Sequence, residues 1–368
     1  MTDTSGKRRT SAALRLAALL ILIGLGGCDN VEWGGVQFAV VPPPTRAVLP
    51  QSELEAAERL PDGPVVYYVR RDSARTEVVP VGAIGDDGLE PILPGDDPEG
   101  FGSRFIAAYL REGAELTLFH RGRRAGTMIV DSAWVATGDA CARVPHATGT
   151  FELGGGAGQA TEFIAMARTQ APDGRGMPGD PEVDRRMQVL GPILAERALR
   201  ARSAQLPAWS TALRQIFPFP VSESRDLAFT STFLVDDELA VGNDTTGYSL
   251  FVVYTPQAQS GYDTAYVAFT DYPTAGKAAP RVIDFLDWNR DGAPELLLDV
   301  YGTERRWFEA VGRVGDGWQR ILDGRCRPAA PRAIAADTGA VVDTVAGSPP
   351  VTAPPRPPRP RPPPGPPP

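Results

Sequence analysis

Residues 282–301 read VIDFLDWNRDGAPELLLDVY, and this stretch decides how the fold is interpreted. It begins with Val282–Leu286 and ends with Leu296–Val300, two apolar runs with the composition of strands. An acidic loop with a glycine at position 292 lies between them. The stretch therefore predicts a strand, a tight loop and a second strand.

Further strand-like runs lie on both sides of this stretch. After Pro220 they are separated by Gly, Asp and Pro turns, a spacing typical of an antiparallel meander. We therefore place a soft boundary near residue 220 and expect a β-rich C-terminal half. The runs are Phe229–Leu234, Leu250–Tyr254, Tyr266–Phe269, Val282–Leu286, Glu295–Tyr301, Trp307–Val311 and Trp318–Leu322.

The half before residue 220 has a mixed pattern. Val65–Val69 and Glu77–Val81 have strand composition. Leu116–Phe119 and Thr127–Val130 flank an Arg-Gly-Arg-Arg turn and predict a hairpin.

Helices are expected in the same half. Residues 83–100 are rich in Gly, Asp and Pro and predict a loop, followed by a short helix over Ser103–Arg111. A longer amphipathic helix is predicted from Asp180, ending at Pro207, with a second helix over Ala208–Phe217. Together the two halves predict an α+β fold.

The loop after Leu286 carries the one candidate site. Its side-chain oxygens alternate along the chain, and calcium takes about six to eight oxygen ligands, which suits carboxylates two residues apart. Counted from Asp287, the twelfth position of this loop is Leu298. An EF-hand requires a bidentate Glu at that position, so an EF-hand is excluded. The candidate ligands are Asp287, Asn289, Asp291, the backbone carbonyl of Ala293, and Glu295.

This loop resembles the calcium loop of FG-GAP and VCBS-type repeats, which occur in propeller blades of surface proteins. The resemblance covers Val282 to Tyr301, and we find no second clear copy. It implies a blade-like β-meander, a structural calcium ion, and adhesion or ligand display. An acidic Asx-turn without a metal is the alternative.

The N-terminus predicts export. Lys7-Arg8-Arg9 precedes an apolar run from Ala12 to Leu25, and Leu25-Gly26-Gly27-Cys28 follows. This ending resembles the lipobox of bacterial lipoproteins, which implies cleavage after residue 27 and a lipid on Cys28. Two or three acyl chains would anchor the protein durably. An ordinary signal anchor is the alternative.

The charge of the chain restricts its partners. The formal net charge is −8, and because residues 1–27 hold one acidic and four basic residues, the chain after the cut carries −11. Nucleic acid is excluded as a partner, since phosphate binding requires a basic face. Lysine occurs only at Lys7 and Lys277, which we attribute to genome bias.

Two cysteines remain besides Cys28. Outside the cytoplasm such cysteines more often pair than stay free, so we predict a Cys141–Cys326 disulfide.

The predicted organisation has five parts. The tail is almost entirely Pro and Arg, which predicts an extended segment that docks on an envelope protein or polymer, or simply a disordered end. The parts are a signal peptide at 1–27, a tether at 28–50, a mixed α/β region at 51–220, a β-rich meander at 221–330 and a disordered Pro-rich tail at 331–368.

Two classes of function remain. The first is a non-enzymatic binding or scaffolding lipoprotein of the cell envelope. The second is an envelope hydrolase acting on peptidoglycan or polysaccharide through carboxylates that the sequence does not identify. No Gly-x-Ser-x-Gly elbow is present, and His120 and His146 are the only histidines, so the sequence assigns no catalytic residue.

Overall fold

The structure is a computed structural model, and most of its described residues lie in strands. It describes residues 59–325 except 73–74, 87, 93, 95–96, 137–143, 155, 175, 177–179, 203, 222–226, 243–245 and 258–260. They belong to a compact unit, Ala56–Pro368, and the other unit, Met1–Glu55, lies outside them. Of the described residues, 54% lie in strands and 17% in helices, so the protein is strand-rich and the α+β class is matched only loosely. Among them no helix is long and apolar enough to cross a membrane.

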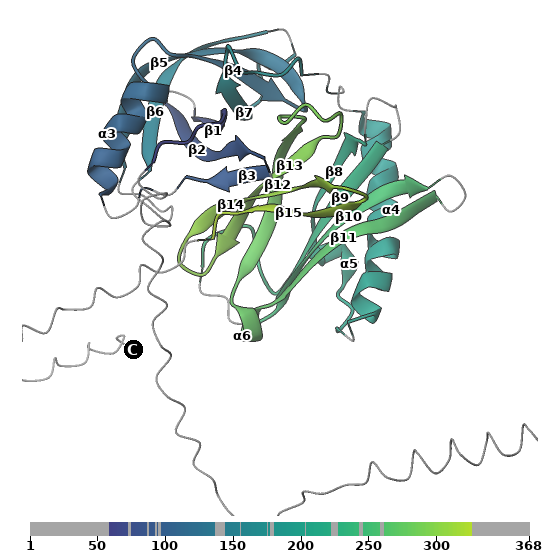
Figure 1. The fold of residues 1–368 in the computed structure, drawn as a ribbon. Helices are drawn as coiled ribbons and strands as arrows, with labels where there is room; N and C mark the ends of the chain where they lie inside the picture. The colour runs from purple at the N-terminus through teal and green to yellow at the C-terminus, as the bar shows by residue number, and fades with distance from the viewer. Residues whose placement is uncertain are drawn as a thin grey trace, which may run out of the picture. The chain divides into compact units, whose positions relative to one another are not determined.

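The first sheet closes on itself (Figure 1). Its order is β1-β7-β4-β5-β6-β2-β3, and the additional pairing of β1 with β2 makes six strands into an antiparallel barrel, with β3 added beside β2. Tyr67 and Phe163 are among the side chains that fill it. The strands are β1 (Val65–Asp72), β2 (Arg75–Gly85), β3 (Gly88–Pro91), β4 (Glu115–His120), β5 (Arg123–Val135), β6 (Pro145–Leu153) and β7 (Glu162–Ala167).

Helix α3 (Pro98–Tyr109) contributes to the barrel core. The side chain of Asp97 accepts a hydrogen bond from the backbone N–H of Gly100, which caps the helix, and Pro98 suits the first turn. Phe101 and Phe105 pack into the core. The prediction of a loop over 83–100 was therefore wrong over much of its length, because the end of β2, all of β3 and the first turn of α3 lie inside it.

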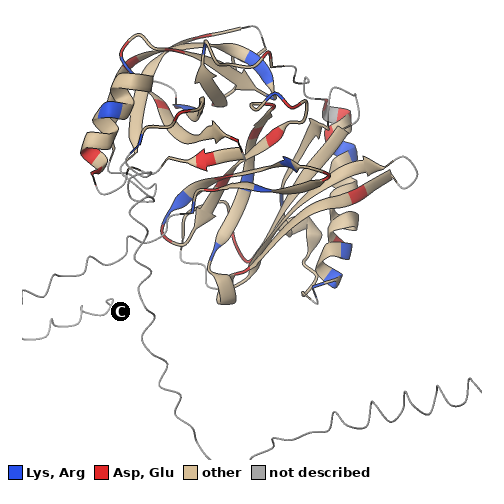
Figure 2. Cartoon of the chain, viewed as in Figure 1, with Lys and Arg blue, Asp and Glu red and all other residues tan. Residues whose placement is uncertain are grey.

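A four-stranded antiparallel sheet follows, in the order β11-β10-β9-β8. Helix α4 (Pro181–Arg200) packs on one face, with Met187 and Leu194 among buried contacts to Phe229 and Tyr254. Figure 2 shows the charges of α4 spread along it. The strands are β8 (Leu213–Pro220), β9 (Leu227–Val235), β10 (Tyr248–Gln257) and β11 (Gly261–Asp271).

The helix predicted over Ala208–Phe217 was wrong beyond its first turn. Only α5 (Trp209–Ala212) is helical, and the chain continues as β8. Because β8 is an edge strand, Pro218 and Pro220 can belong to it although proline donates no ladder hydrogen bond.

The third sheet is a meander of four strands in sequence order. With it, every strand predicted after residue 220, in the second and third sheets, is confirmed. A short helix, α6 (Tyr272–Ala275), precedes the third sheet. Its strands are β12 (Ala278–Leu286), β13 (Glu295–Gly302), β14 (Arg306–Val314) and β15 (Gly317–Asp323).

The first two strands of this third sheet, β12 and β13, are buried on both faces. Leu297 packs with Tyr68 and Ile164 of the barrel, whereas Leu296 and Leu298 pack with Phe219 and Phe251 of the β8–β11 sheet. Burial of each leucine contributes about 1.5–3 kcal/mol relative to exposure. The uninterrupted Leu296–Leu298 run follows from this double burial.

Candidate functional site

The loop from Asp287 to Pro294 joins β12 to β13. The last strand pair before it is Leu286 with Glu295. Arg290 has a φ of 64° and Gly292 a φ of 88°, and these two left-handed residues reverse the chain direction. A Cβ at Gly292 would meet nothing within 4 Å, so glycine is favoured there by its backbone angle alone.

Backbone N–H groups hold the acidic side chains in place. Asp287 Oδ2 accepts from Gly292 N at 3.1 Å, and Asp291 Oδ1 accepts from Ala293 N at 2.8 Å. Glu295 Oε2 accepts from Trp288 N at 3.1 Å. Each carboxylate thus has one oxygen held by the loop backbone.

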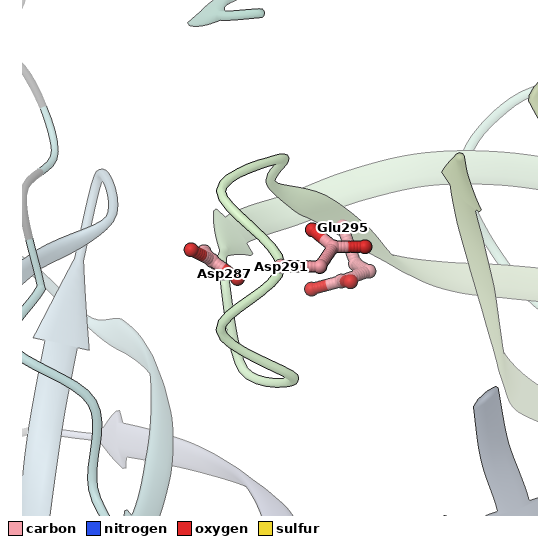
Figure 3. A group of neighbouring side chains, drawn as sticks. All are labelled: Asp287, Asp291 and Glu295. Carbon is pink, nitrogen blue, oxygen red and sulfur yellow. The ribbon is translucent and has the colours of Figure 1, made fainter. Parts of the chain in front are cut away.

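Three of the five predicted ligands lie together (Figure 3). One oxygen from each of Asp287, Asp291 and Glu295 lies within 4.8 Å of the other two. Asp287 Oδ1 is buried and has no hydrogen-bond partner. The side-chain amide of Asn289 donates to Asp291 Oδ2 at 3.1 Å, which places it beside the cluster, and Ala293 contributes its N–H to Asp291.

The electrostatics of the cluster favour a cation. Burial, reinforced by the charges of Asp291 and Asp287, raises the pKa of Glu295 to about 9. Burial likewise raises the pKa of Asp287. An all-oxygen donor set with an unpartnered carboxylate oxygen fits a hard divalent cation such as calcium, whose charge would offset this repulsion.

The loop also docks on the barrel. Trp288 is 3% exposed and packs with the apolar cluster between the barrel and the third sheet. Arg290 Nη2 donates to the carbonyls of Gln170 and Ala171, at 2.8 and 3.2 Å, just after β7. A hollow of about 310 Å³ lies beside the loop, lined in part by Gln170, Trp288 and Asn289. A conformational change of the loop would therefore reach the interface between barrel and sheet.

A second cluster of polar side chains lies between β7 and the third sheet. Arg281 donates to Glu162 through Nη1 and Nη2 and to Asp299 through Nη2 at 3.1 Å. Tyr68 Oη donates to Glu162 at 2.6 Å. Burial alone would raise the pKa of Glu162, but the hydrogen bonds from Arg281 and Tyr68 outweigh it and lower the pKa.

His120 and Asp284 lie next to this cluster. Asp284 is fully buried and accepts from the backbone N–H groups of Arg121 and Phe285 at 2.7 and 2.8 Å. Burial raises its pKa to about 7. His120 Nδ1 lies 3.6 Å from Asp284 Oδ2, and burial, followed by the charge of Arg121, lowers the pKa of His120. A pocket of about 350 Å³ is lined in part by His120, Gly156 and Glu162.

The remaining predicted site residues lie outside the described residues. They are Cys28, Cys141 and Cys326, together with the signal, the tether and the Pro-rich tail. Sequence reasoning missed Glu162, Arg281 and Asp284, whose partners are far away in the chain and leave no local spacing signal.

No family model, curated protein or solved structure matches this chain.

Proposed function

We propose that this protein is a lipid-anchored binding or scaffolding module of the bacterial cell envelope, stabilised by a structural calcium ion. Leu25-Gly26-Gly27-Cys28 supports the anchor and the extracytoplasmic location. The membrane is the first partner, reached through the lipid on Cys28, and an envelope protein or polymer is the second, reached through the Pro/Arg tail. A Cys141–Cys326 disulfide and the division into a mixed first half and a β-rich second half belong to the same proposal.

The geometry of the Asp287–Glu295 loop is the observation that supports calcium binding. Three carboxylates converge on it, and Asp287 Oδ1 is buried without a partner. The loop joins the first two strands of a four-stranded antiparallel meander, an arrangement similar to a propeller blade with an FG-GAP or VCBS-like loop. That resemblance supports adhesion or ligand display.

The ion would act by holding the β12–β13 hairpin. It would lie among Asp287, Asp291 and Glu295 and offset their mutual repulsion. Because Trp288 and Arg290 of the same loop contact the barrel side, a fixed loop also stabilises the packing of the barrel on the third sheet.

An envelope hydrolase is the alternative, and one observation bears on it. Glu162 and Asp284 lie near His120 with opposed pKa shifts, as an acid and base pair requires. Both oxygens of Glu162 are hydrogen-bonded, however, and Asp284 is enclosed by backbone N–H groups. This geometry suits a structural network better than a site that must exchange protons with a substrate.

Thermal unfolding with calcium and with a chelator tests the proposal. We expect the unfolding midpoint of the mature protein to rise with calcium, in proportion to the logarithm of calcium concentration over its dissociation constant. Asp287→Ala with Asp291→Ala should abolish the rise. Asp316→Ala, which removes an exposed acid from the β14–β15 turn, should retain it. An unchanged wild-type midpoint at millimolar calcium contradicts the metal.

The anchor needs a separate test. Cys28→Ser should move the protein from the membrane fraction to the soluble fraction and remove the lipid mass from its first peptide. Retention of the lipid mass in the variant would rule out Cys28 as its site.

A further inference from the structure

Lys277 and Asp237 form a fully buried pair between two sheets. Lys277 immediately precedes β12, and Asp237 lies just after β9. Their side chains are in direct contact and both are 0% exposed. Lys277 is the only lysine after residue 7, whereas every other basic side chain of the folded part is Arg or His.

The carboxyl group of Asp237 is held from several directions. Its Oδ1 accepts from Lys277 Nζ and from the backbone N–H of Glu238 at 2.7 Å. Its Oδ2 accepts from Tyr272 Oη at 2.5 Å. Arg214 donates to the backbone carbonyl of Asp237 at 2.8 Å, and a φ of 54° at Asp236 turns the chain into this position. The carboxyl carbon is therefore presented to Nζ in a fixed orientation.

Burial makes this pair reactive as well as close. Two charges are costly to hold away from water, and condensation removes both of them from the buried contact. A desolvated lysine amine is a nucleophile. Fixed proximity and the exclusion of water favour condensation over hydrolysis.

We propose that Lys277 and Asp237 join in an intramolecular isopeptide bond. The Nζ lone pair attacks Asp237 Cγ, the bond between Cγ and one carboxyl oxygen breaks, and an amide and one water molecule result. The amine supplies one proton to the departing hydroxyl, so no oxidant, reductant or cofactor takes part. The bond links the end of β9 to the start of β12, positions 40 residues apart, and ties the β8–β11 sheet covalently to the β12–β15 sheet.

Tyr272 is the catalytic residue of this condensation. Its hydroxyl contacts Asp237 Oδ2, so it donates to the oxygen on which negative charge develops as Nζ attacks. The backbone N–H of Tyr272 donates to Gly247 O at 3.2 Å, and this hydrogen bond helps to place α6 beside Lys277 and Asp237.

The lysine distribution provides a direct test on the full chain. A lysine-specific protease should cut the denatured precursor after Lys7 but not after Lys277, and Lys7 serves as the internal control for protease activity. The intact mass should be lower than the sequence mass by one water molecule. Fragment spectra should show the peptide containing Asp237 joined to the peptide containing Lys277. Cleavage after Lys277 together with the full sequence mass overturns the proposal.

Three variants complete the test. Lys277→Arg keeps the positive charge but should restore the full sequence mass, whereas Asp316→Ala should still lose one water. Tyr272→Phe should leave a measurable fraction of the chain without the link. Water loss in Lys277→Arg would assign the mass change to another site and overturn the proposal.

Discussion

Arg281 of β12 donates two parallel hydrogen bonds to Glu162 of β7, a residue 119 positions earlier, at 2.6 and 2.7 Å. The same guanidinium reaches Asp299 of β13, its cross-strand neighbour. This paired contact joins the barrel to the third sheet at a half-buried position, where a fork-shaped cation matches a carboxylate better than lysine would.

Arg281→Met is therefore expected to destabilise the fold. It leaves Glu162 with Tyr68 and Asp299 with Arg306, so two carboxylates lose their nearest charge. Loss of one partner of a fully buried pair costs about 3–5 kcal/mol, and this half-buried pair should cost less than that. Urea unfolding measures the difference. The matched control is Arg168→Met, which breaks the exposed Arg168–Glu115 pair and should leave the midpoint unchanged. Equal midpoints for the two variants would show that the Arg281 network does not stabilise the interface.

Asp284→Asn should change how stability depends on pH. The folded pKa of Asp284 is raised to about 7, so its contribution is fully present below the unfolded pKa of about 4 and is lost as the pH rises to about 7. Across that window the wild type should lose up to about 1.4 kcal/mol per pH unit from this group. Asn does not titrate, and its single side-chain oxygen can keep one of the two backbone hydrogen bonds, so the loss of the other lowers its stability by an amount that does not depend on pH. The unfolding free energy of the wild type, measured at several pH values, should therefore fall relative to that of the variant from pH 4 to 7, and a constant difference contradicts the assignment.

Gly122→Ala tests the close packing of the barrel turn on β12. Gly122 has a φ of 67°, and a Cβ there would lie 2.4 Å from Phe285 Cε2. Gly113 has a φ of 78°, but a Cβ there would meet nothing within 4 Å. Both alanine variants carry the left-handed cost, and only Gly122→Ala adds overpacking, so it should be less stable than Gly113→Ala by about 1–3 kcal/mol. Equal losses in denaturant titrations would mean that Phe285 moves aside freely.

The parts of the fold that sequence predicts are those decided locally. The strands of the third sheet are strand-like runs bounded by turn residues, and in β13 burial on both faces makes the apolar run Leu296–Leu298 unbroken. By contrast, β6 is interrupted by Gly149, which is required because a Cβ there would lie 2.1 Å from Ile129 O of the neighbouring strand. Strand β8 contains two prolines that only its edge position permits.

In the polar sites, too, the sequence predicts the residues that lie close together in the chain and misses the pairs that lie far apart. Asp287, Asp291 and Glu295 lie within nine residues, so their spacing alone indicates that they converge. Asp284 meets Arg121 across 163 residues, and Lys277 meets Asp237 across 40. Such pairs depend on how sheets pack, which no local period records.

Glu295→Gln should separate the metal from the loop geometry. Glu295 is 3% exposed and its pKa is raised to about 9, so without calcium at pH 8 the fold must either hold a proton there or bury an uncompensated charge. Gln removes that cost, and its carbonyl oxygen can still accept from Trp288 N. In chelator at pH 8 the variant should therefore be more stable than the wild type. In calcium the order should reverse, because the wild type gains binding energy and the variant has lost a charged ligand. Paired melting curves with calcium and with chelator decide it: if the variant is less stable than the wild type in both, Glu295 serves the hairpin through its hydrogen bond and not through a cation.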